Sequence, residues 1–160
     1  MTALDAAQER FLAEARRAVL ATIDPDGRPR LVPICHVLLG TSGDTTLYSP
    51  LDEKPKRAAD PHALGRVRDL LARPDVSVLV DRWDEDWTRL AWLRVDGTAR
   101  LLEPGDGAVA MERAAVIVAL RAKYRQYADH DLEANPMIRI VLERVTAWGS
   151  LDTARSGPGS

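Results

Sequence analysis

Two short segments carry most of the recognisable chemistry of this chain. Residues 24–33 read DPDGRPRLVP, and residues 47–57 read LYSPLDEKPKR. The first predicts a tight turn that feeds a strand, because proline presets φ and glycine supplies a positive φ. The second predicts a strand that runs into a cationic loop. Together they would form an apolar floor beside a phosphate-binding cluster, which suits a flat, phosphorylated cofactor.

The cationic loop contains Lys54, Lys56 and Arg57. Lysine and arginine bind phosphate through charge-assisted hydrogen bonds, so these three side chains could hold a phosphate-bearing tail. The neighbouring Asp52 and Glu53 would partly neutralise the cluster. On the residues alone, an ordinary solvated loop therefore remains an alternative.

Proline at position 33 marks an unusual point in an apolar run. Pro33 lacks a backbone N–H, so a central strand disfavours it. We expect it where the sheet splits or where a ligand lies against the backbone. Ordinary core packing of Val32 and Ile34 is the alternative.

The tryptophans and the single cysteine have simpler interpretations. Trp87 follows three acidic residues in a predicted loop, so an interface or a pocket wall suits it better than the core. Core or dimer packing is the expectation for Trp148.

Cys35 and His36 would point to opposite faces of a strand and cannot form a nucleophile pair. We predict a buried thiol and a core histidine. A polar cluster at residues 124–131 is either a surface helix end or a substrate contact.

Composition indicates one soluble domain over residues 1–150, followed by a disordered tail at 151–160. The chain has 160 residues, 46% of them hydrophobic, and a net charge of −2. The three histidines and the one cysteine make no metal-binding or disulfide pattern. There is no basic run for nucleic acid, no membrane span and no apolar signal core, so we expect a cytoplasmic protein that binds neither nucleic acid nor membrane.

Apolar periodicity predicts a mainly β fold with interspersed helices. The expected helices cover residues 4–17, 64–71 and 104–127, and the expected strands cover 18–23, 30–39, 45–50, 76–80, 90–102 and 137–148. Short links between the first three strands favour an antiparallel meander. The strand at 30–39 is apolar on both faces, which argues against an edge exposed to water. Gly97 suggests a bulge that bends its strand. Six antiparallel strands of this kind favour a small barrel.

The order of the motifs DPDGRP, LVPICHVL, LYSPLDEKPKR, DRWDEDW, LRVDGTARLLEP and KYRQYADHDLEANPMIRI resembles a known family. It is similar to the split β-barrel flavin and deazaflavin oxidoreductases, which are relatives of pyridoxamine 5′-phosphate oxidase, over about residues 10–150. The DEKPKR and DEDW segments resemble the branch that uses coenzyme F420, an 8-hydroxy-5-deazaflavin. The resemblance implies an FMN-binding split β-barrel fold, a homodimer, and a cofactor in the groove between subunits.

The resemblance also implies roles for particular residues. The cofactor ring would contact residues 30–34 and 47–49, the phosphate-bearing tail would contact the cationic loop, and two tryptophans would reach the partner's cofactor or the substrate. The implied cofactor-binding residues are Arg30, Val32, Pro33, Ile34, Tyr48, Ser49, Lys54, Lys56, Arg57, Trp87 and Trp92.

The implied activity is hydride transfer between reduced F420 and a small organic substrate, with no dedicated acid–base pair among the residues. An FMN enzyme of the pyridoxamine phosphate oxidase type, a non-enzymatic F420- or flavin-binding protein, and a dimeric domain without a ligand are the alternatives.

Overall fold

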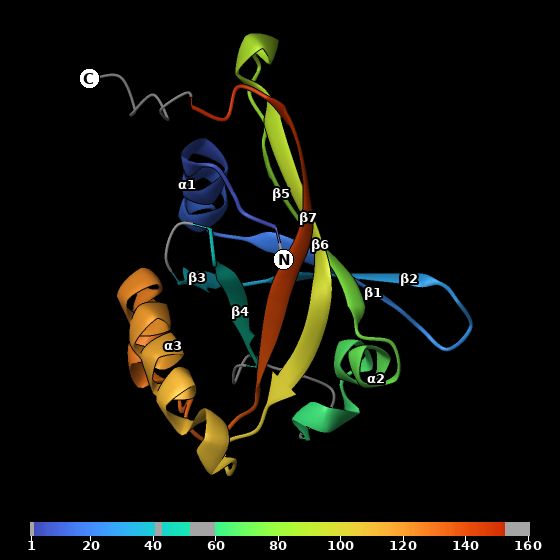
Figure 1. The fold of residues 1–160 in the computed structure, drawn as a ribbon, viewed down its shortest axis with the longest axis vertical. Coiled ribbons are helices and arrows are strands. Elements are labelled where there is room, and N and C mark those ends of the chain that lie inside the picture. The colour runs from blue at the N-terminus through green and yellow to red at the C-terminus, as the bar shows by residue number, and fades with distance from the viewer. Residues whose placement is uncertain (1, 41–42, 52–59, 153–160) are drawn as a thin grey trace.

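The computed structural model describes residues 2–40, 43–51 and 60–152 (Figure 1). Within these residues one antiparallel sheet has seven strands in the order β2-β1-β5-β6-β7-β4-β3. The strands are β1 (Ala18–Ile23), β2 (Pro29–Ile34), β3 (Val37–Leu39), β4 (Thr46–Pro50), β5 (Asp75–Arg82), β6 (Ala91–Leu102) and β7 (Met137–Gly149). The α-helices are α1 (Ala6–Glu14), α2 (Gly65–Ala72) and α3 (Ala110–Lys123).

The turn predicted from DPDGRP is confirmed as the hairpin between β1 and β2. Gly27 adopts a φ of 80°, which the glycine in this motif permits. The Asp24 carboxylate accepts hydrogen bonds from the backbone N–H groups of Asp26 and Arg28, both at 2.9 Å. This hairpin places β2 at one edge of the sheet.

The prediction of six strands is wrong, because the segment predicted as one strand at 30–39 divides into two. β2 ends at Ile34, and β3 begins at Val37 on the opposite edge of the sheet. The first three strands therefore do not form a meander. Because Cys35 and His36 alone link the two edges, the sheet must curl to bring them near each other. The edges are not paired with each other, so the curled sheet is a split barrel and not a closed one.

The break after β2 has an identifiable cause in the surrounding contacts. The backbone N–H of His36 donates to the Tyr124 hydroxyl at 3.1 Å, and the His36 Nε2 lies 2.7 Å from the Leu12 carbonyl oxygen. The histidine is fully buried, which confirms the expected core position. Cys35 is only half-buried, unlike the prediction, because it lies in the link between the strands.

The position of Pro33 agrees with its interpretation as a marker of the split. It lies in β2, two residues before the chain leaves this edge of the sheet. The expectation that the strand could not be a water-exposed edge is wrong, because β2 pairs only with β1 among the described residues, and Leu31 is 67% exposed. The outward-facing Leu31 of β2 belongs instead to a surface groove.

The bulge predicted at Gly97 is confirmed, although the extra residue lies on the partner strand. Asp96 pairs with Arg144 and Gly97 pairs with Leu142, which leaves Glu143 of β7 without a pair. A Cβ at position 97 would lie 2.2 Å from the Val141 carbonyl oxygen, so only glycine fits this approach.

Two apolar clusters stabilise the fold. The first fills the inside of the curled sheet and includes Leu20, Leu47, Val78, Leu93 and Ile140. The second packs α3 against β3 and β4 and includes Tyr48, Val116, Leu120 and Met137. The helix expected over 104–127 is shorter, because 3-10 turns at Gly107–Val109 (η3) and Arg125–Asp129 (η4) flank α3. Among the described residues, no helix is long and apolar enough to cross a membrane.

Candidate functional site

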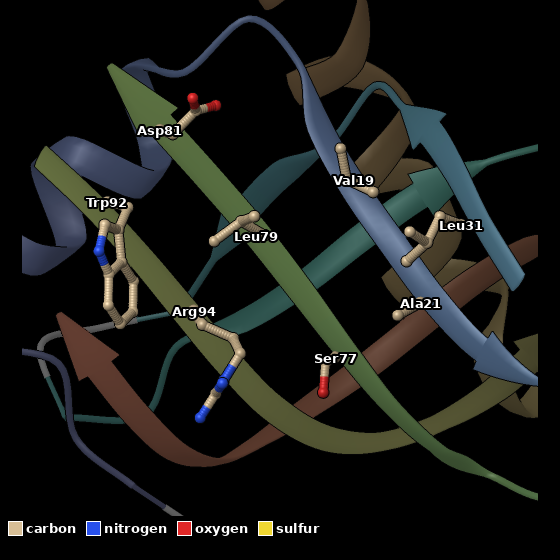
Figure 2. A pocket seen from close by; sticks show the side chains of 8 residues that line it. All are labelled: Val19, Ala21, Leu31, Ser77, Leu79, Asp81, Trp92 and Arg94. Carbon is tan, nitrogen blue, oxygen red and sulfur yellow. The ribbon is translucent and has the colours of Figure 1, made fainter. Parts of the chain in front are cut away.

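A groove lies on the outer face of the sheet, across the four strands β2, β1, β5 and β6 (Figure 2). Its volume is about 600 Å³, and its lining residues are Val19, Ala21, Leu31, Ser77, Leu79, Asp81, Trp92 and Arg94. Alternate residues of a strand share a face, so these side chains form rows across the sheet. Val19 pairs with Leu79, which pairs with Arg94, and Asp81 pairs with Trp92.

The floor of the groove is mostly apolar, and its polar residues lie in two places: Ser77 and Arg94 lie near Asp96, and Asp81 lies beside Trp92. Leu31 is 67% exposed and Leu79 is 39% exposed, so large apolar side chains face solvent here. The Ser77 hydroxyl donates to the Asp96 carboxylate at 2.6 Å, and the Arg94 Nε lies 3.5 Å from the same carboxylate. The hydrogen bond from Ser77 is the main cause that lowers the pKa of Asp96. The groove thus offers a flat apolar surface with few polar groups, as small-molecule sites and interfaces do.

The structure separates the two tryptophans that were predicted to act together. Trp92 lines the groove and pairs across the sheet with Trp148, which is 54% exposed. Trp87 lies in the 3-10 turn Trp87–Arg89 (η2), in the β5–β6 connection that projects at the top of Figure 1. It is 71% exposed and is not a lining residue of the groove. Its contact with a partner's cofactor stays a prediction.

The residues predicted on β2 divide between two faces of the strand. Leu31 faces the groove, and Pro33 pairs with the groove residue Val19. Val32 and Ile34 contact the inner apolar cluster instead. β2 therefore presents an apolar side chain to the groove while its alternate residues anchor the strand to the core.

Arg30 is fixed by a buried acidic residue of α2. Its Nε lies 2.7 Å from Oδ2 of Asp69, and the carboxylate also accepts a hydrogen bond from the Thr22 hydroxyl at 2.7 Å. The hydrogen bond to Asp69 raises the pKa of Arg30. A Cβ at Gly65 would lie 2.7 Å from the Arg30 Cζ, so this glycine makes room for the guanidinium. The Arg30 side chain remains 44% exposed, which leaves part of it accessible to a ligand.

The predicted contacts on β4 lie away from the groove. Tyr48 is buried in the second apolar cluster, where its hydroxyl donates to Glu112 of α3 at 2.6 Å. Burial, followed by the interaction with Glu112, raises the pKa of Tyr48 to about 12. Ser49 is 1% exposed. Lys54, Lys56 and Arg57 lie outside the described residues, so the phosphate-binding loop stays a prediction.

Sequence reasoning missed the groove residues contributed by β1 and β5. The segment VSVLV reads as a continuous apolar strand, which hid the fact that Leu79 points outward. The groove itself depends on β1 lying beside β5, which local patterns do not specify.

Comparisons with known proteins agree with this architecture. The family model described as pyridoxamine 5′-phosphate oxidase matches residues 4–149. No curated relative matches the chain. A conserved hypothetical protein from Mycobacterium tuberculosis has a TM-score of 0.68 and 19% identity, with 99% of this chain and 94% of that chain covered.

Other solved structures with this fold bind different cofactors. A FAD-binding protein from Mesorhizobium loti has a TM-score of 0.64 and 22% identity, covering 92% of this chain and 95% of that one. An F420 reductase has a TM-score of 0.57 and 18% identity, covering 89% and 98%. Heme-binding proteins also occur among the neighbours. At these identities the structures show the fold alone, whereas the family model covers most of the sequence: the chain belongs to the pyridoxamine 5′-phosphate oxidase family, whose fold is the split β-barrel.

Proposed function

We propose that this protein is an F420-dependent oxidoreductase that transfers a hydride between reduced F420 and a small organic substrate. Membership of a family of flavin- and deazaflavin-binding proteins supports the proposal, as does an F420 reductase among the neighbours of the fold. The observation that carries it is the position of β2, an edge strand beside an apolar groove.

The edge strand offers the two surfaces that a deazaflavin needs. Because β2 has no second neighbour among the described residues, backbone polar groups on one side of it lack a sheet partner. These groups can bind the polar rim of a ring system. Leu31 supplies apolar contact on the groove side, and Arg30, which Asp69 holds on the other face of the strand, supplies a partly exposed cation at the sheet edge. A flat ring with a phosphate-bearing tail fits this combination.

The residues of the proposed site would bind the cofactor and orient it. The cofactor, when bound, supplies the hydride chemistry. Leu31, Leu79 and Trp92 would exclude water from one face of the ring. Lys54, Lys56 and Arg57 would hold the tail through charge-assisted hydrogen bonds. Among the described residues that line the groove, there is no histidine, tyrosine, lysine or cysteine. Any proton that the reaction needs would therefore come from water or from another lining group, such as the Asp81 carboxyl.

The groove face also supports the proposal that the protein is a homodimer. Leu31 of β2, Leu79 of β5 and Trp148 of β7 are exposed at 67%, 39% and 54%. The strands between them contribute the groove residues Val19, Ala21 and Trp92. Exposed apolar surface of this kind is typical of an interface, and a two-fold dimer would cover the same surface on both copies. A cofactor in the groove would then lie between subunits.

Two other functions fit parts of the site. An FMN enzyme of the oxidase type would use the same edge strand and groove. A heme-binding protein is suggested by some neighbours of the fold. The described groove residues include no histidine, cysteine, methionine or tyrosine to ligate iron, and the His36 ring is fully buried. The groove therefore favours a flavin-type ring over heme.

Turnover separates an oxidoreductase from a carrier of the same cofactor. Reduced F420 would be incubated anaerobically with the protein and a panel of quinones, nitroaromatics and enones, while its reoxidation is followed by absorbance. We expect at least one acceptor to reoxidise the cofactor faster with the wild-type protein than with the Arg30→Ala variant. Tight binding without protein-dependent reoxidation by any acceptor would favour a carrier.

A further inference from the structure

A second cluster of charged side chains lies outside the groove, around the ring of Tyr124. Tyr124 follows α3 and is 9% exposed. Its hydroxyl accepts a hydrogen bond from the backbone N–H of His36 and lies 3.0 Å from the Arg16 carbonyl oxygen, to which it donates. The ring is therefore held in one orientation by two segments that are distant in the sequence.

Two cations contact this one ring. The Arg16 Cζ lies 4.8 Å from the Tyr124 ring centroid, and the Lys123 Nζ lies 5.3 Å from it. Both distances are within the range of cation–π interactions. Lys123 also donates a hydrogen bond to the His36 carbonyl oxygen at 2.9 Å. Two of the three ammonium protons of Lys123 remain for another acceptor.

Neither cation has an acidic partner in the part of the chain that the structure describes. The ion pairs found there use other basic residues, for example Arg30 with Asp69 and Arg121 with Glu133. Burial and then the charge of Arg16 lower the pKa of Lys123 to about 8. The two positive charges therefore repel each other, and an anion between them would relieve that repulsion.

Stabilisation of a helix end accounts for part of this arrangement. A lysine in the last turn of α3 is favourable, because the C-terminal end of a helix carries partial negative charge. Arg16 belongs to a different segment, between α1 and β1, and its guanidinium lies over Tyr124, the residue that caps the same helix end. The two cations therefore contact one ring from two separate segments, and the guanidinium adds planar N–H donors that suit an oxyanion.

We propose that Arg16 and Lys123 form an oxyanion-binding site around Tyr124, and that its ligand is the phosphate or carboxylate group of a small metabolite. None of these residues lines the groove, so the site is separate from the cofactor-binding surface and does not depend on which cofactor the protein uses. Guanidinium and ammonium donors together suit either oxyanion.

The test measures the affinity of inorganic phosphate and the titration of the Lys123 amine. Phosphate would be added at constant ionic strength, with sodium chloride as the balancing salt, while the amine is followed by NMR of isotopically labelled lysine. We expect phosphate to raise the pKa of Lys123 by about one unit, because a nearby anion favours the charged amine. A parallel arm with glycerol phosphate and another with acetate would distinguish a phosphoester ligand from a carboxylate.

Two variants distinguish specific binding of phosphate from non-specific screening of the protein's charges by the added anion. Arg16→Gln should weaken phosphate binding at least tenfold, since hydrogen bonds to charged groups are among the strongest that side chains make. Arg17→Gln removes the same charge from the next residue and should leave the affinity unchanged. Arg16 is exposed, so its substitution should not prevent folding. Equal phosphate responses in Arg16→Gln and Arg17→Gln, or no response of the Lys123 amine in the wild-type protein to any of the three anions, would overturn the proposal.

Discussion

The Nε of Arg30 lies 2.7 Å from Oδ2 of Asp69, whose side chain is only 2% exposed. This pair joins the edge strand β2 to α2, and it fixes the orientation of a partly exposed guanidinium on the face of β2 opposite the groove residue Leu31. Asp69 thereby acts as a positioning residue, because its charge holds Arg30 without facing the groove.

Removal of the Asp69 charge should loosen Arg30 and weaken cofactor binding. Asp69→Asn keeps the size of the side chain and an oxygen that can accept from Thr22, so its main effect should be a several-fold lower affinity for F420. Arg30→Ala should cause a larger loss, and Arg28→Ala, a change of an exposed arginine in the preceding turn, should cause none. Fluorescence titration of the wild type and the three variants with F420 measures this order of affinities. Equal affinities for the wild type and Arg30→Ala would remove Arg30 from the site.

Asp69→Ala should also destabilise the fold. The Thr22 hydroxyl is 1% exposed and donates to Asp69, so the alanine variant would leave a buried hydroxyl without its acceptor. A loss of about 1–3 kcal/mol in the free energy of unfolding is expected for such a change. Urea denaturation measures it, with Asp69→Asn as the control that retains an acceptor. Alanine and asparagine variants of equal stability would argue against this role for Asp69.

A charge in the groove should disrupt the proposed dimer. Leu79→Asp places a carboxylate on the apolar face and should shift a micromolar sample toward monomer. Leu71→Asp is the matched control, because Leu71 is 59% exposed on α2 and is not a lining residue of the groove. Light scattering reports the mass of each protein. A wild-type protein that is monomeric and still binds the cofactor would contradict a site between subunits.

Stability should fall in acid because of His36. Burial, followed by the charge of Lys123, lowers the pKa of this histidine from 6.5 to about 4. Between these values the unfolded chain binds a proton that the folded protein does not, so the stabilisation is complete above pH 6.5 and is lost as the pH falls toward 4. A loss of about 3 kcal/mol is expected from a shift of this size.

The control for this pH dependence is His36→Gln, which keeps a donor for the Leu12 carbonyl oxygen but does not titrate. Urea denaturation at several pH values should show a shallower acid dependence for the glutamine variant than for the wild type. Parallel curves would mean that other groups cause the acid sensitivity.

The close approach of β6 to β7 at the bulge should tolerate no side chain at position 97. Gly97→Ala would bring a Cβ to within 2.2 Å of the Val141 carbonyl oxygen and separate β6 from β7. Overpacking of this kind costs roughly 1–3 kcal/mol. Gly105→Ala is the control, because no atom lies within 4 Å of a Cβ there. Thermal denaturation should show a lower Tm only for the first variant; equal Tm values would show that the strands adjust without cost.

Local patterns predicted most strands because each has a clear apolar face. The first strand was predicted at the bounds it has in the structure, residues 18–23. The division of residues 30–39 was missed although Pro33 marked a possible split, because the apolar residues on both sides of Cys35 suit one continuous strand. The break depends on the Tyr124 hydroxyl, which contacts the His36 backbone across 88 positions of sequence. An interaction between such distant residues leaves no trace in a local pattern.

The candidate site was predictable only where its residues lie on one continuous segment. The turn before β2 and the special place of its proline were predictable, but its exposed edge position was not, and the groove beside it needs the strand order that places β1 next to β5. The family resemblance implied a ring contact for Tyr48, whereas the structure packs Tyr48 in the second apolar cluster with its hydroxyl on Glu112 of α3. Whether a strand residue points toward a ligand site or toward a helix depends on tertiary packing.

The central claim is tested most directly by parallel titrations of the purified protein with coenzyme F420, FMN and heme, each followed by fluorescence or absorbance. The account predicts micromolar or tighter binding of F420, weaker binding of FMN, and an at least tenfold weaker affinity for F420 in the Lys54→Ala, Lys56→Ala double variant, since each charged hydrogen bond contributes about 1.5–3 kcal/mol. Binding of FMN or heme without measurable binding of F420 would contradict it.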